Sequence, residues 1–480
     1  MRTVSRGVVF FALLALAAYD GAADKKADRQ AQLNRFEKLV DAYQTKLAES
    51  VKSLAAGHAE LARWCAKSGF GSEADAEKAR ALGLDPSLEA ALANLSAPAA
   101  PAAPDPKAAA ELAKKHKALA AGLAKDYIEL ANWCKRTGME LEFRKTIRKL
   151  VRLVPVNPDV RKFLGQQKHQ GEWLTFEEIQ KKKGLSFYRG KWLPEAPYAK
   201  TREGDLEKRR ASLSKQYKLE FKGMYTPHLD VFYTVSEERA KEDVPVLTAF
   251  FEKVHPEMFT GEFKQPFTFL YVSGPEQFTQ IGQRPGALGV YSGGTLYSYE
   301  GAEGTGTYVH ELTHGMVDIS FPQGAPGWFN EGIASFFESF KTRPAKTGGG
   351  LEFEFGYVNH RQEVLMAALE GGTLPHLRDF VKRTDQTASD LDYAQGRALF
   401  SYLFAKGLLD SFLLRVQLEP GKKSILEHLE ETLLQPVDAI HEDFVKFNEA
   451  NQKVWTLLKP VTMADDTVDA KVKFEEYAGY

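Results

Sequence analysis

The spacing of two histidines constrains this chain more than any other feature of its sequence. His310 and His314 enclose Glu311 in the segment HELTH. The surrounding pattern predicts a helix over 305–319, and positions four apart on a helix lie on one face. Two imidazoles held in this way can bind one metal ion and leave room for a third protein ligand. Glu311 could accept a proton from a water molecule at such a site.

A candidate for the third ligand follows at a short distance. A second helical pattern begins near Trp328, after a turn rich in glycine and proline, and Glu331 lies one turn into it. The short loop makes the two helices antiparallel neighbours, so the Glu331 carboxylate could complete a His₂Glu site for one Zn²⁺ per chain. The alternative is that both histidines are surface residues and that Glu331 is a solvated or capping acid.

These segments resemble the gluzincin metallopeptidases, which combine HExxH with a glutamate ligand. WFNEGIA, residues 328–334, is similar to the W-x-N-E-G-x-A signature of the zinc aminopeptidases, and YAQGRAL, residues 393–399, is similar to a second segment of that family. The resemblance implies zinc ligands, a general base and a tyrosine that stabilises an oxyanion. These roles fall on His310, His314 and Glu331 as ligands, Glu311 as base and Tyr393 as hydroxyl donor. For Tyr393, a packing or surface role is the alternative.

The sequence also departs from these families. The aminopeptidases carry an acidic residue ahead of the zinc helix that holds the amino terminus of the substrate, and residues 286–294 here contain no acid. This absence argues against aminopeptidase specificity and leaves endopeptidase action or an unusual substrate open. Ser335 stands where the thermolysin group has an aspartate that orients a zinc histidine, so that partner is missing or supplied otherwise; Asp318 is one candidate. The layout also resembles the secreted peptidase-MA-like domains.

Composition agrees with a folded protein of more than one domain. The chain has 480 residues, of which 44% are hydrophobic and 26% charged, and its formal net charge is −1. This length allows two or three packed domains, and the balanced charge argues against a dedicated nucleic-acid binder.

The amino terminus has the pattern of a targeting segment. Arg2 and Arg6 precede an apolar run over 7–18, and small residues follow at 21–23. The run is short for a membrane span, so the sequence predicts a cleaved signal peptide and export to the periplasm or the extracellular space. An uncleaved anchor is the alternative. No membrane span is expected after cleavage.

An internal repeat surrounds the two cysteines. ELARWCAKSG, residues 60–69, matches ELANWCKRTG, residues 129–138, and places Cys65 and Cys134 at equivalent positions. Each copy is followed by a second helical pattern, which predicts a pair of tetratricopeptide-like helical hairpins. Both cysteines are expected in the interior, and a disulfide between them stays open. A groove of such helices could bind a protein partner, or the hairpins could pack on the peptidase domain.

The predicted architecture is α+β: a thermolysin-like zinc peptidase domain with a sheet lobe and a helical lobe, preceded by an all-α helical-hairpin region. Two GxWL segments, at 171–174 and 190–193, each predict a small strand pair or a loop held by a tryptophan in the connector. His360 and His376 are secondary candidates for substrate polarisation. The predicted division is a signal peptide at 1–23, a first hairpin at 24–96, an Ala/Pro linker at 97–106, a second hairpin at 107–168, a connector at 169–204, the peptidase domain at 205–460 and a tail at 461–480.

The sequence thus favours a secreted zinc peptidase that acts on peptides or proteins, with Glu311 as general base. A second hypothesis is an inactive peptidase-like binding protein that uses the helical repeats as a docking surface. A third is a zinc hydrolase that acts on a non-peptide amide.

Overall fold

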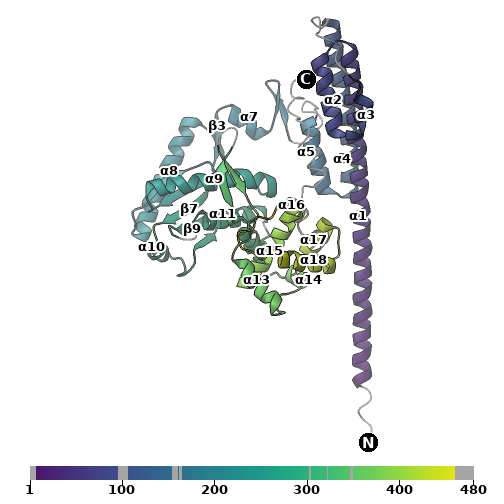
Figure 1. Ribbon diagram of the computed structural model, residues 1–480. Coiled ribbons are helices and arrows are strands. Elements are labelled where there is room, and N and C mark those ends of the chain that lie inside the picture. Colours follow the sequence, from purple (N-terminus) through teal and green to yellow (C-terminus); the bar gives the residue numbers. More distant parts are fainter. Residues whose placement is uncertain are drawn as a thin grey trace. The chain divides into compact units, whose positions relative to one another are not determined.

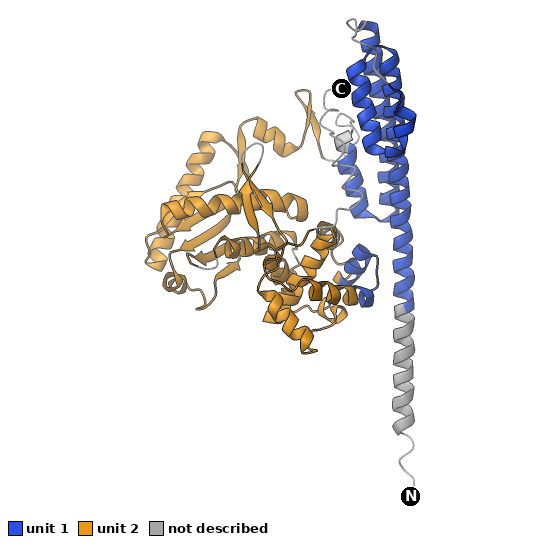
Figure 2. Ribbon diagram, viewed as in Figure 1, with its two compact units in different colours: residues 1–157, 426–440, 464–480 blue, residues 158–425, 441–463 orange. Residues whose placement is uncertain are grey.

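The computed structural model divides into two compact units (Figure 2). Unit 1 comprises residues 1–157, 426–440 and 464–480, and unit 2 comprises residues 158–425 and 441–463. The described residues are 7–95, 106–153, 161, 165–301, 304–321, 323–345 and 350–459, with backbone alone for 7–26 and 151–153. The predicted linker at 97–106 and tail at 461–480 lie outside these ranges apart from residue 106, and the predicted signal peptide overlaps the first turns of α1.

Unit 1 contains the two predicted helical hairpins (Figure 1). In each, a glycine with positive φ, Gly69 at +83° and Gly138 at +74°, ends the first helix and admits the turn. Cys65 and Cys134 are both buried and both free, and burial raises the pKa of their thiols to about 11 and about 12. The helices of this part are α1 (Gly7–Lys67), α2 (Gly71–Leu84), the 3₁₀ turn η1 (Pro86–Leu88), α3 (Glu89–Leu92), α4 (Pro106–Thr137) and α5 (Glu140–Leu153).

The two hairpins contact each other reciprocally. The Lys46 ammonium on α1 lies 5.9 Å from the Trp133 ring centroid on α4, and the Lys115 ammonium on α4 lies 5.4 Å from the Trp64 ring centroid on α1. Lys115 and Trp133 are the repeat equivalents of Lys46 and Trp64. Because each lysine covers the tryptophan of the other copy, α1 and α4 are antiparallel and an approximate two-fold axis relates the hairpins. This arrangement differs from the same-direction stacking expected of tandem tetratricopeptide-like repeats.

One helical segment near the carboxyl terminus belongs to unit 1, although the sequence grouped it with the peptidase domain. Arg29 on α1 donates to the Glu430 carboxylate at 2.7 Å and to the Glu427 carbonyl at 3.2 Å. Arg29 thereby links residues 426–440 to α1. They include most of α17 (Ile425–Leu433) and the beginning of α18 (Val437–Ala450).

Unit 2 contains a five-stranded mixed sheet in the order β5-β6-β7-β9-β8. The three inner strands are parallel, while β5 and β8 are antiparallel edge strands. β7 is buried along its whole length, as its continuous apolar run predicts. The strands are β5 (Lys222–Tyr225), β6 (Leu229–Tyr233), β7 (Phe267–Val272), β8 (Gly289–Ser292) and β9 (Thr295–Tyr299).

Helices cover both faces of this sheet. On one face, Leu270 and Val272 of β7 pack with Leu213 of α8 (Glu195–Tyr217) and Phe278 of α10 (Pro275–Gln280). Alternate residues of β7 point to the other face, where the Phe269 ring lies 5.5 Å from the ring of Tyr308 on α11. Helix α11 (Thr305–Ser320) contacts α9 (Glu237–Met258) and the strands β8 and β9. The sheet thereby holds α11 beside its edge strand.

A helical lobe completes unit 2, so the predicted α+β class is confirmed. Helix α12 (Gly327–Phe337) packs between α11 and α15 (Asp390–Ala405), and α15 also contacts α13 (Arg361–Glu370) and α16 (Leu409–Leu418). The other elements are β1 (Gln167–His169), β2 (Glu172–Leu174), α7 (Phe176–Lys182), β3 (Leu185–Tyr188), β4 (Lys191–Pro194), β10 (Lys341–Pro344), β11 (Leu351–Glu354) and α14 (Leu377–Phe380).

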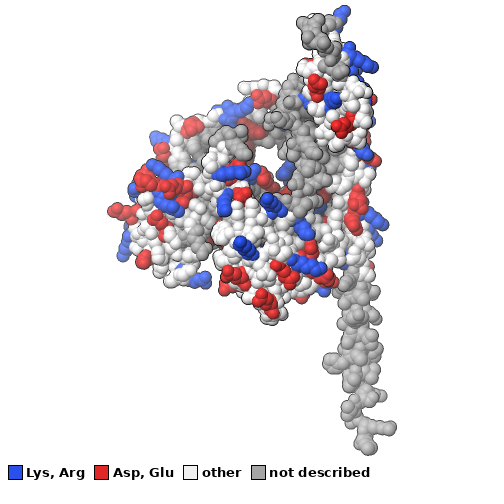
Figure 3. Space-filling view, viewed as in Figure 1, with Lys and Arg blue, Asp and Glu red and all other residues white. Residues whose placement is uncertain are grey.

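In the connector, both GxWL segments lie in strand pairs, the first of the two alternatives that the sequence left open. β1 pairs with β2 and β3 pairs with β4, with Trp173 on β2 and Trp192 on β4. On the face visible in Figure 3, acidic and basic side chains are interspersed, in keeping with the net charge near zero. No helix in the described part of the chain is both long and apolar enough to cross a bilayer.

Candidate metal centre

Helix α11 carries both predicted histidine ligands on one face. It extends from Thr305 to Ser320, close to the predicted range. The rings of His310 and His314 lie one turn apart, with centroids separated by 4.7 Å and planes at 86° to each other. Each residue is 8% exposed, so neither is a surface histidine. The alternative of two solvated histidines is therefore wrong.

Helix α12 brings Glu331 to the two imidazoles. Its carboxylate Oε2 lies 3.2 Å from Nε2 of His310 and 3.3 Å from Nε2 of His314. Ligands at about 2.0–2.1 Å from a tetrahedrally coordinated ion are separated from one another by about 3.3 Å. The observed separations match this value, and the ligand atoms of the three residues all lie within 4.8 Å of one another. These residues can therefore hold a metal ion.

The outer nitrogens of both imidazoles have acceptors. Nδ1 of His310 lies 2.8 Å from a carboxylate oxygen of Glu338, and Nδ1 of His314 lies 2.9 Å from the amide oxygen of Asn330. Each Nδ1 therefore donates a proton to its partner, and each Nε2, which faces Glu331, is the nitrogen available to a metal ion. Metal-bound histidines depend on such partners to fix the tautomer and the ring orientation.

Asp318 does not play this part. Its carboxylate accepts a hydrogen bond at 2.8 Å from the hydroxyl of Tyr291, a residue of β8. Ser335, at the position of the aspartate in the thermolysin group, is buried and its hydroxyl has no hydrogen-bond partner among the described residues. The carboxylate that orients a histidine of the cluster is instead Glu338, which follows Glu331 by seven residues at the end of α12.

Glu338 is itself held from the opposite side. Its second oxygen accepts hydrogen bonds from the Asn359 amide at 2.9 Å and from Nε of Arg361 at 3.1 Å. Burial alone would raise the pKa of this carboxyl, but the hydrogen bond and charge of His310, together with Arg361, lower it to about 2. Glu338 is therefore ionised at neutral pH and stabilises positive charge on the ligand beside it.

The electrostatics of the cluster favour a cation. Burial opposes a charged imidazole, yet the hydrogen bonds that His310 donates to Glu331 and Glu338 raise the pKa of His310 to about 10, and the hydrogen bond to Glu331 also raises the pKa of His314. The hydrogen bonds from both histidines lower the pKa of Glu331 despite its burial. Without a metal the cluster retains protons, and a divalent cation would replace them.

The predicted base lies beside the edge strand. Glu311 is 5% exposed, and burial raises the pKa of its carboxyl. Gly289, the first residue of β8, approaches it so closely that a β-carbon on this glycine would lie 2.5 Å from Oε1 of Glu311. The carboxylate is thus positioned between the histidine pair on its own helix and the strand that borders the sheet.

Tyr393 also reaches the cluster. Its ring stacks at 6.4 Å and 13° on the ring of His310, and the Arg361 guanidinium lies 4.7 Å from its centroid. Burial raises the pKa of its hydroxyl, and so do the charge of Glu331 and a hydrogen bond with that carboxylate. The hydroxyl is therefore protonated at neutral pH and available as a donor.

Two glycines set the position of Tyr393 relative to Glu331. Helices α12 and α15 cross at Gly332 and Gly396, where a β-carbon on Gly332 would lie 2.8 Å from the α-carbon of Gly396. The backbones therefore touch, one residue after the ligand and three after the tyrosine. This contact explains why both sequence segments contain a glycine.

The secondary candidates do not join the cluster. His360 is exposed at the start of α13. His376 caps α14 by accepting a hydrogen bond from the Arg378 backbone, and its ring lies 4.0 Å from that of His441. Sequence reasoning missed Glu338, Asn330 and Arg361. Asn330 lies within the WFNEGIA segment, whereas Glu338 follows that segment by four residues and Arg361 lies on α13.

No protein-family model matches this sequence, and no curated protein is significantly similar to it. The functional interpretation therefore depends on the residues of the motifs and on their geometry. Segments that are well separated in the chain, HELTH, WFNEGIA and YAQGRAL, supply one cluster of side chains in unit 2.

Proposed function

We propose that this chain is an exported zinc-dependent peptidase that hydrolyses internal peptide bonds. The observation that carries the proposal is the convergence of His310, His314 and Glu331 at the spacing of tetrahedral ligands, with Glu311 beside them and an edge strand within contact. Export is part of the proposal on the evidence of the amino-terminal pattern alone.

Zinc is the ion that best suits this donor set. Two imidazoles and one carboxylate are the ligands of open catalytic zinc sites, whereas magnesium and calcium prefer sets made of oxygen alone. When bound, zinc would supply Lewis acidity, which acidifies a water molecule and polarises a carbonyl group. His310 and His314 would bind through Nε2, because their Nδ1–H groups donate hydrogen bonds to Glu338 and Asn330.

The protein residues divide the remaining work. Glu311 would take the proton of the attacking water and deliver it to the leaving nitrogen, and burial, which raises the pKa of its carboxyl, makes it a stronger base than an exposed glutamate. Tyr393 would donate its hydroxyl hydrogen to the carbonyl oxygen as negative charge develops there. The Arg361 guanidinium, 4.7 Å from the Tyr393 ring centroid, also contacts this ring.

The edge strand supports a peptide as the substrate. β8 is the last strand of the sheet, so its outward backbone groups are available to an extended chain. Pairing there would lay a peptide bond across Glu311, because Gly289 begins the strand. No acid occurs in residues 286–294 to hold a substrate amino terminus, which favours internal cleavage.

Metal analysis combined with two variants tests the proposal. Purified protein is expected to contain about one zinc ion per chain, to lose it in His314→Ala and to keep it in Glu311→Gln. Cleavage of a denatured protein substrate should occur only with the unaltered chain. Absence of bound zinc even after zinc is added, or equal cleavage by Glu311→Gln, would overturn the proposal and favour a binding protein.

A further inference from the structure

The approximate two-fold axis of unit 1 creates two seams between α1 and α4, and one of them is filled. In this filled seam, Leu119 of α4 packs on Gly57 of α1, so closely that a β-carbon on Gly57 would lie 2.3 Å from Cδ1 of Leu119. Leu119 also packs against the apolar cluster around Leu61 and Cys65. A leucine on one helix and a glycine on the other thus close this side of the interface.

The second seam carries polar residues at the same places. The repeat equivalent of Leu119 is Ser50, and the equivalent of Gly57 is Asp126. The Ser50 hydroxyl donates to the Lys46 carbonyl at 3.0 Å instead of reaching across to α4. Neither residue can supply the apolar contact that leucine and glycine make, so this seam remains open.

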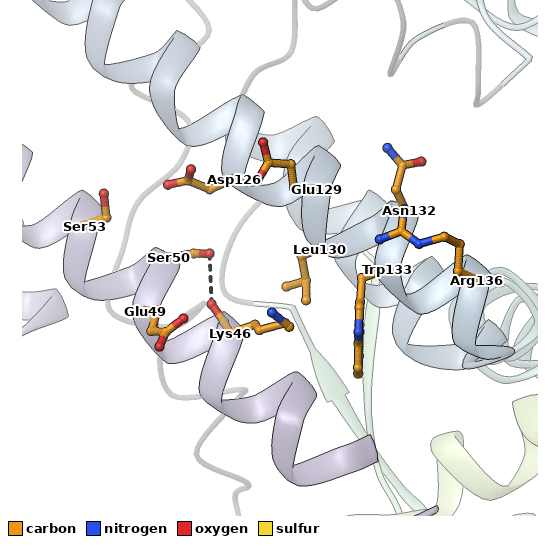
Figure 4. Close-up of a pocket in the computed structure, with 10 residues that line it drawn as sticks. All are labelled: Lys46, Glu49, Ser50, Ser53, Asp126, Glu129, Leu130, Asn132, Trp133 and Arg136. Atoms are coloured by element: carbon orange, nitrogen blue, oxygen red, sulfur yellow. Dashed lines mark hydrogen bonds between the residues drawn. The ribbon is translucent and has the colours of Figure 1, made fainter. Parts of the chain in front are cut away.

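A cavity of about 570 Å³ occupies this open seam. Figure 4 shows its side chains projecting from α1 and α4, with the Trp133 ring at one end. On α1 the lining residues lie at spacings of three, four and seven, which is the side of a helix that normally packs against its neighbour. The residues at the cavity are Lys46, Glu49, Ser50, Ser53, Asp126, Glu129, Leu130, Asn132, Trp133 and Arg136.

The charges of the cavity disfavour an ionic ligand. Three carboxylates, on Glu49, Asp126 and Glu129, face two cations, on Lys46 and Arg136. The carboxylates would repel an anion, and the lysine and arginine would repel a cation. In either case this repulsion would offset part of the attraction between the ligand and the groups of opposite charge. None of the three carboxylates is in an ion pair with another residue in the described part of the chain. Their oxygens are therefore available as hydrogen-bond acceptors.

The remaining chemistry suits a neutral ligand that is rich in hydroxyl groups. Carboxylates accept hydrogen bonds, the lysine and arginine donate them, and serine and asparagine do both. The half-buried Trp133 ring adds a flat apolar surface. The Lys46 ammonium lies 5.9 Å from its centroid, so a ligand would share the ring with this lysine or displace it. A pyranose ring offers the complement: a flat face of C–H groups and a rim of hydroxyls, each of which donates and accepts. A cavity of this volume is in the ordinary range for small-ligand sites.

We propose that the open seam between α1 and α4 is a saccharide-binding site, with Trp133 as the stacking surface and Ser50 and Asp126 as the residues that keep it open. The site lies wholly within unit 1 and does not depend on the peptidase proposal. It gives the helical hairpins a binding function of their own.

The filled seam provides the variant that tests this proposal. Ser50→Leu combined with Asp126→Gly copies the pair Leu119 and Gly57 into the open seam, so the double variant is expected to fold and to lose the cavity. Calorimetric titration of the intact chain would use cellobiose, maltose, lactose and N,N′-diacetylchitobiose as probes. The unaltered protein is expected to bind at least one of them, and the double variant to bind it at least about tenfold more weakly.

A matched pair of tryptophan variants separates stacking from folding. Trp133→Ala is expected to weaken binding by about tenfold or more, whereas Trp64→Ala, at the equivalent place in the filled seam, should leave it unchanged. Circular dichroism would establish that both remain helical. Failure of all four sugars to bind, unaltered binding by the double variant, or binding of peptides in place of sugars at this cavity would overturn the proposal.

Discussion

Gly289 touches the carboxylate of Glu311: a β-carbon at this glycine would lie 2.5 Å from Oε1 and 2.8 Å from Cγ of the glutamate. The conformation of Gly289 is not the cause, because its φ is not positive. A glycine is required at this position because the Glu311 side chain leaves no room for a β-carbon. The edge strand and the proposed base therefore share one contact surface, and a change to the strand can displace the base without touching a metal ligand.

Gly289→Ala is expected to lower kcat while zinc stays bound. The new methyl group must push Glu311 aside, and a displacement of about 1 Å in a reacting group can cost about 10²-fold in rate. Peptidase assays and metal analysis on the same preparation would measure both effects. Gly204→Ala on α8 is the control, since a β-carbon there meets no atom within 4 Å. Equal activity of the two variants would contradict the contact.

Tyr393→Phe tests the hydroxyl donor. Loss of one donor to a developing oxyanion typically lowers kcat by about 10²–10³-fold, and KM and zinc content should stay unchanged because the ring still stacks on His310. Tyr357→Phe, which removes a hydroxyl bonded to Glu354, is the matched control. If Tyr393→Phe raised KM alone, the tyrosine would contribute to substrate binding and not to the transition state.

Glu338→Gln is expected to weaken zinc binding about 10–100-fold, as is typical for the outer partner of a metal-bound histidine. The variant keeps the shape of the side chain but removes the charge that acts on His310. Competition with a fluorescent chelator would give the affinity. Ser335→Ala is the comparison, because the Ser335 hydroxyl has no partner among the described residues and its removal should leave zinc affinity unchanged. A similar affinity in both variants would refute the role of Glu338.

The helical hairpins should become less stable in acid. Burial lowers the pKa of His116, so the unfolded chain takes up this proton first as the pH falls below about 6.5. Burial would raise the pKa of Glu77, but its hydrogen bond with His58 and the nearby charges of Arg80 and His116 lower it. The stability that Glu77 contributes is present above its ordinary value of 4.5 and is lost below it.

Replacing His116 by leucine, the residue at the equivalent position of the first repeat, should flatten the upper part of this pH dependence. Hydrogen exchange of α2 and α4 amides, corrected for the intrinsic effect of pH, would measure the local stability between about pH 7 and pH 4. An unchanged slope between pH 6.5 and 4.5 would show that His116 is not the group responsible.

Much of the metal centre could be predicted because its residues obey local rules. The four-residue spacing of His310 and His314 fixes their common face, and the short turn before α12 fixes where Glu331 must lie. Tyr393 required a resemblance, since no local rule relates a residue on α15 to one on α11. Glu338 was missed because its role depends on the angle between α11 and α12, which spacing alone does not give.

The helical unit shows a different limit. The repeat predicted both hairpins and the burial of both cysteines, because each copy contains its own helical pattern. It did not predict the contact between Lys46 and Trp133, because a repeat shows which residues are equivalent but not which residues are in contact. The significance of Ser50 and Asp126 becomes visible only when the antiparallel pairing of α1 and α4 is known.

The backbone contact between Gly332 and Gly396 limits which substitutions this chain can tolerate at the crossing of α12 and α15. With no side chain in the crossing, nothing can be repacked there to compensate for a substitution at either glycine. A mutation to any larger residue would separate α12 from α15 and move Glu331 and Tyr393 apart in a single step. A single substitution at either glycine is therefore expected to disturb the proposed ligand Glu331 and the proposed hydroxyl donor Tyr393 together.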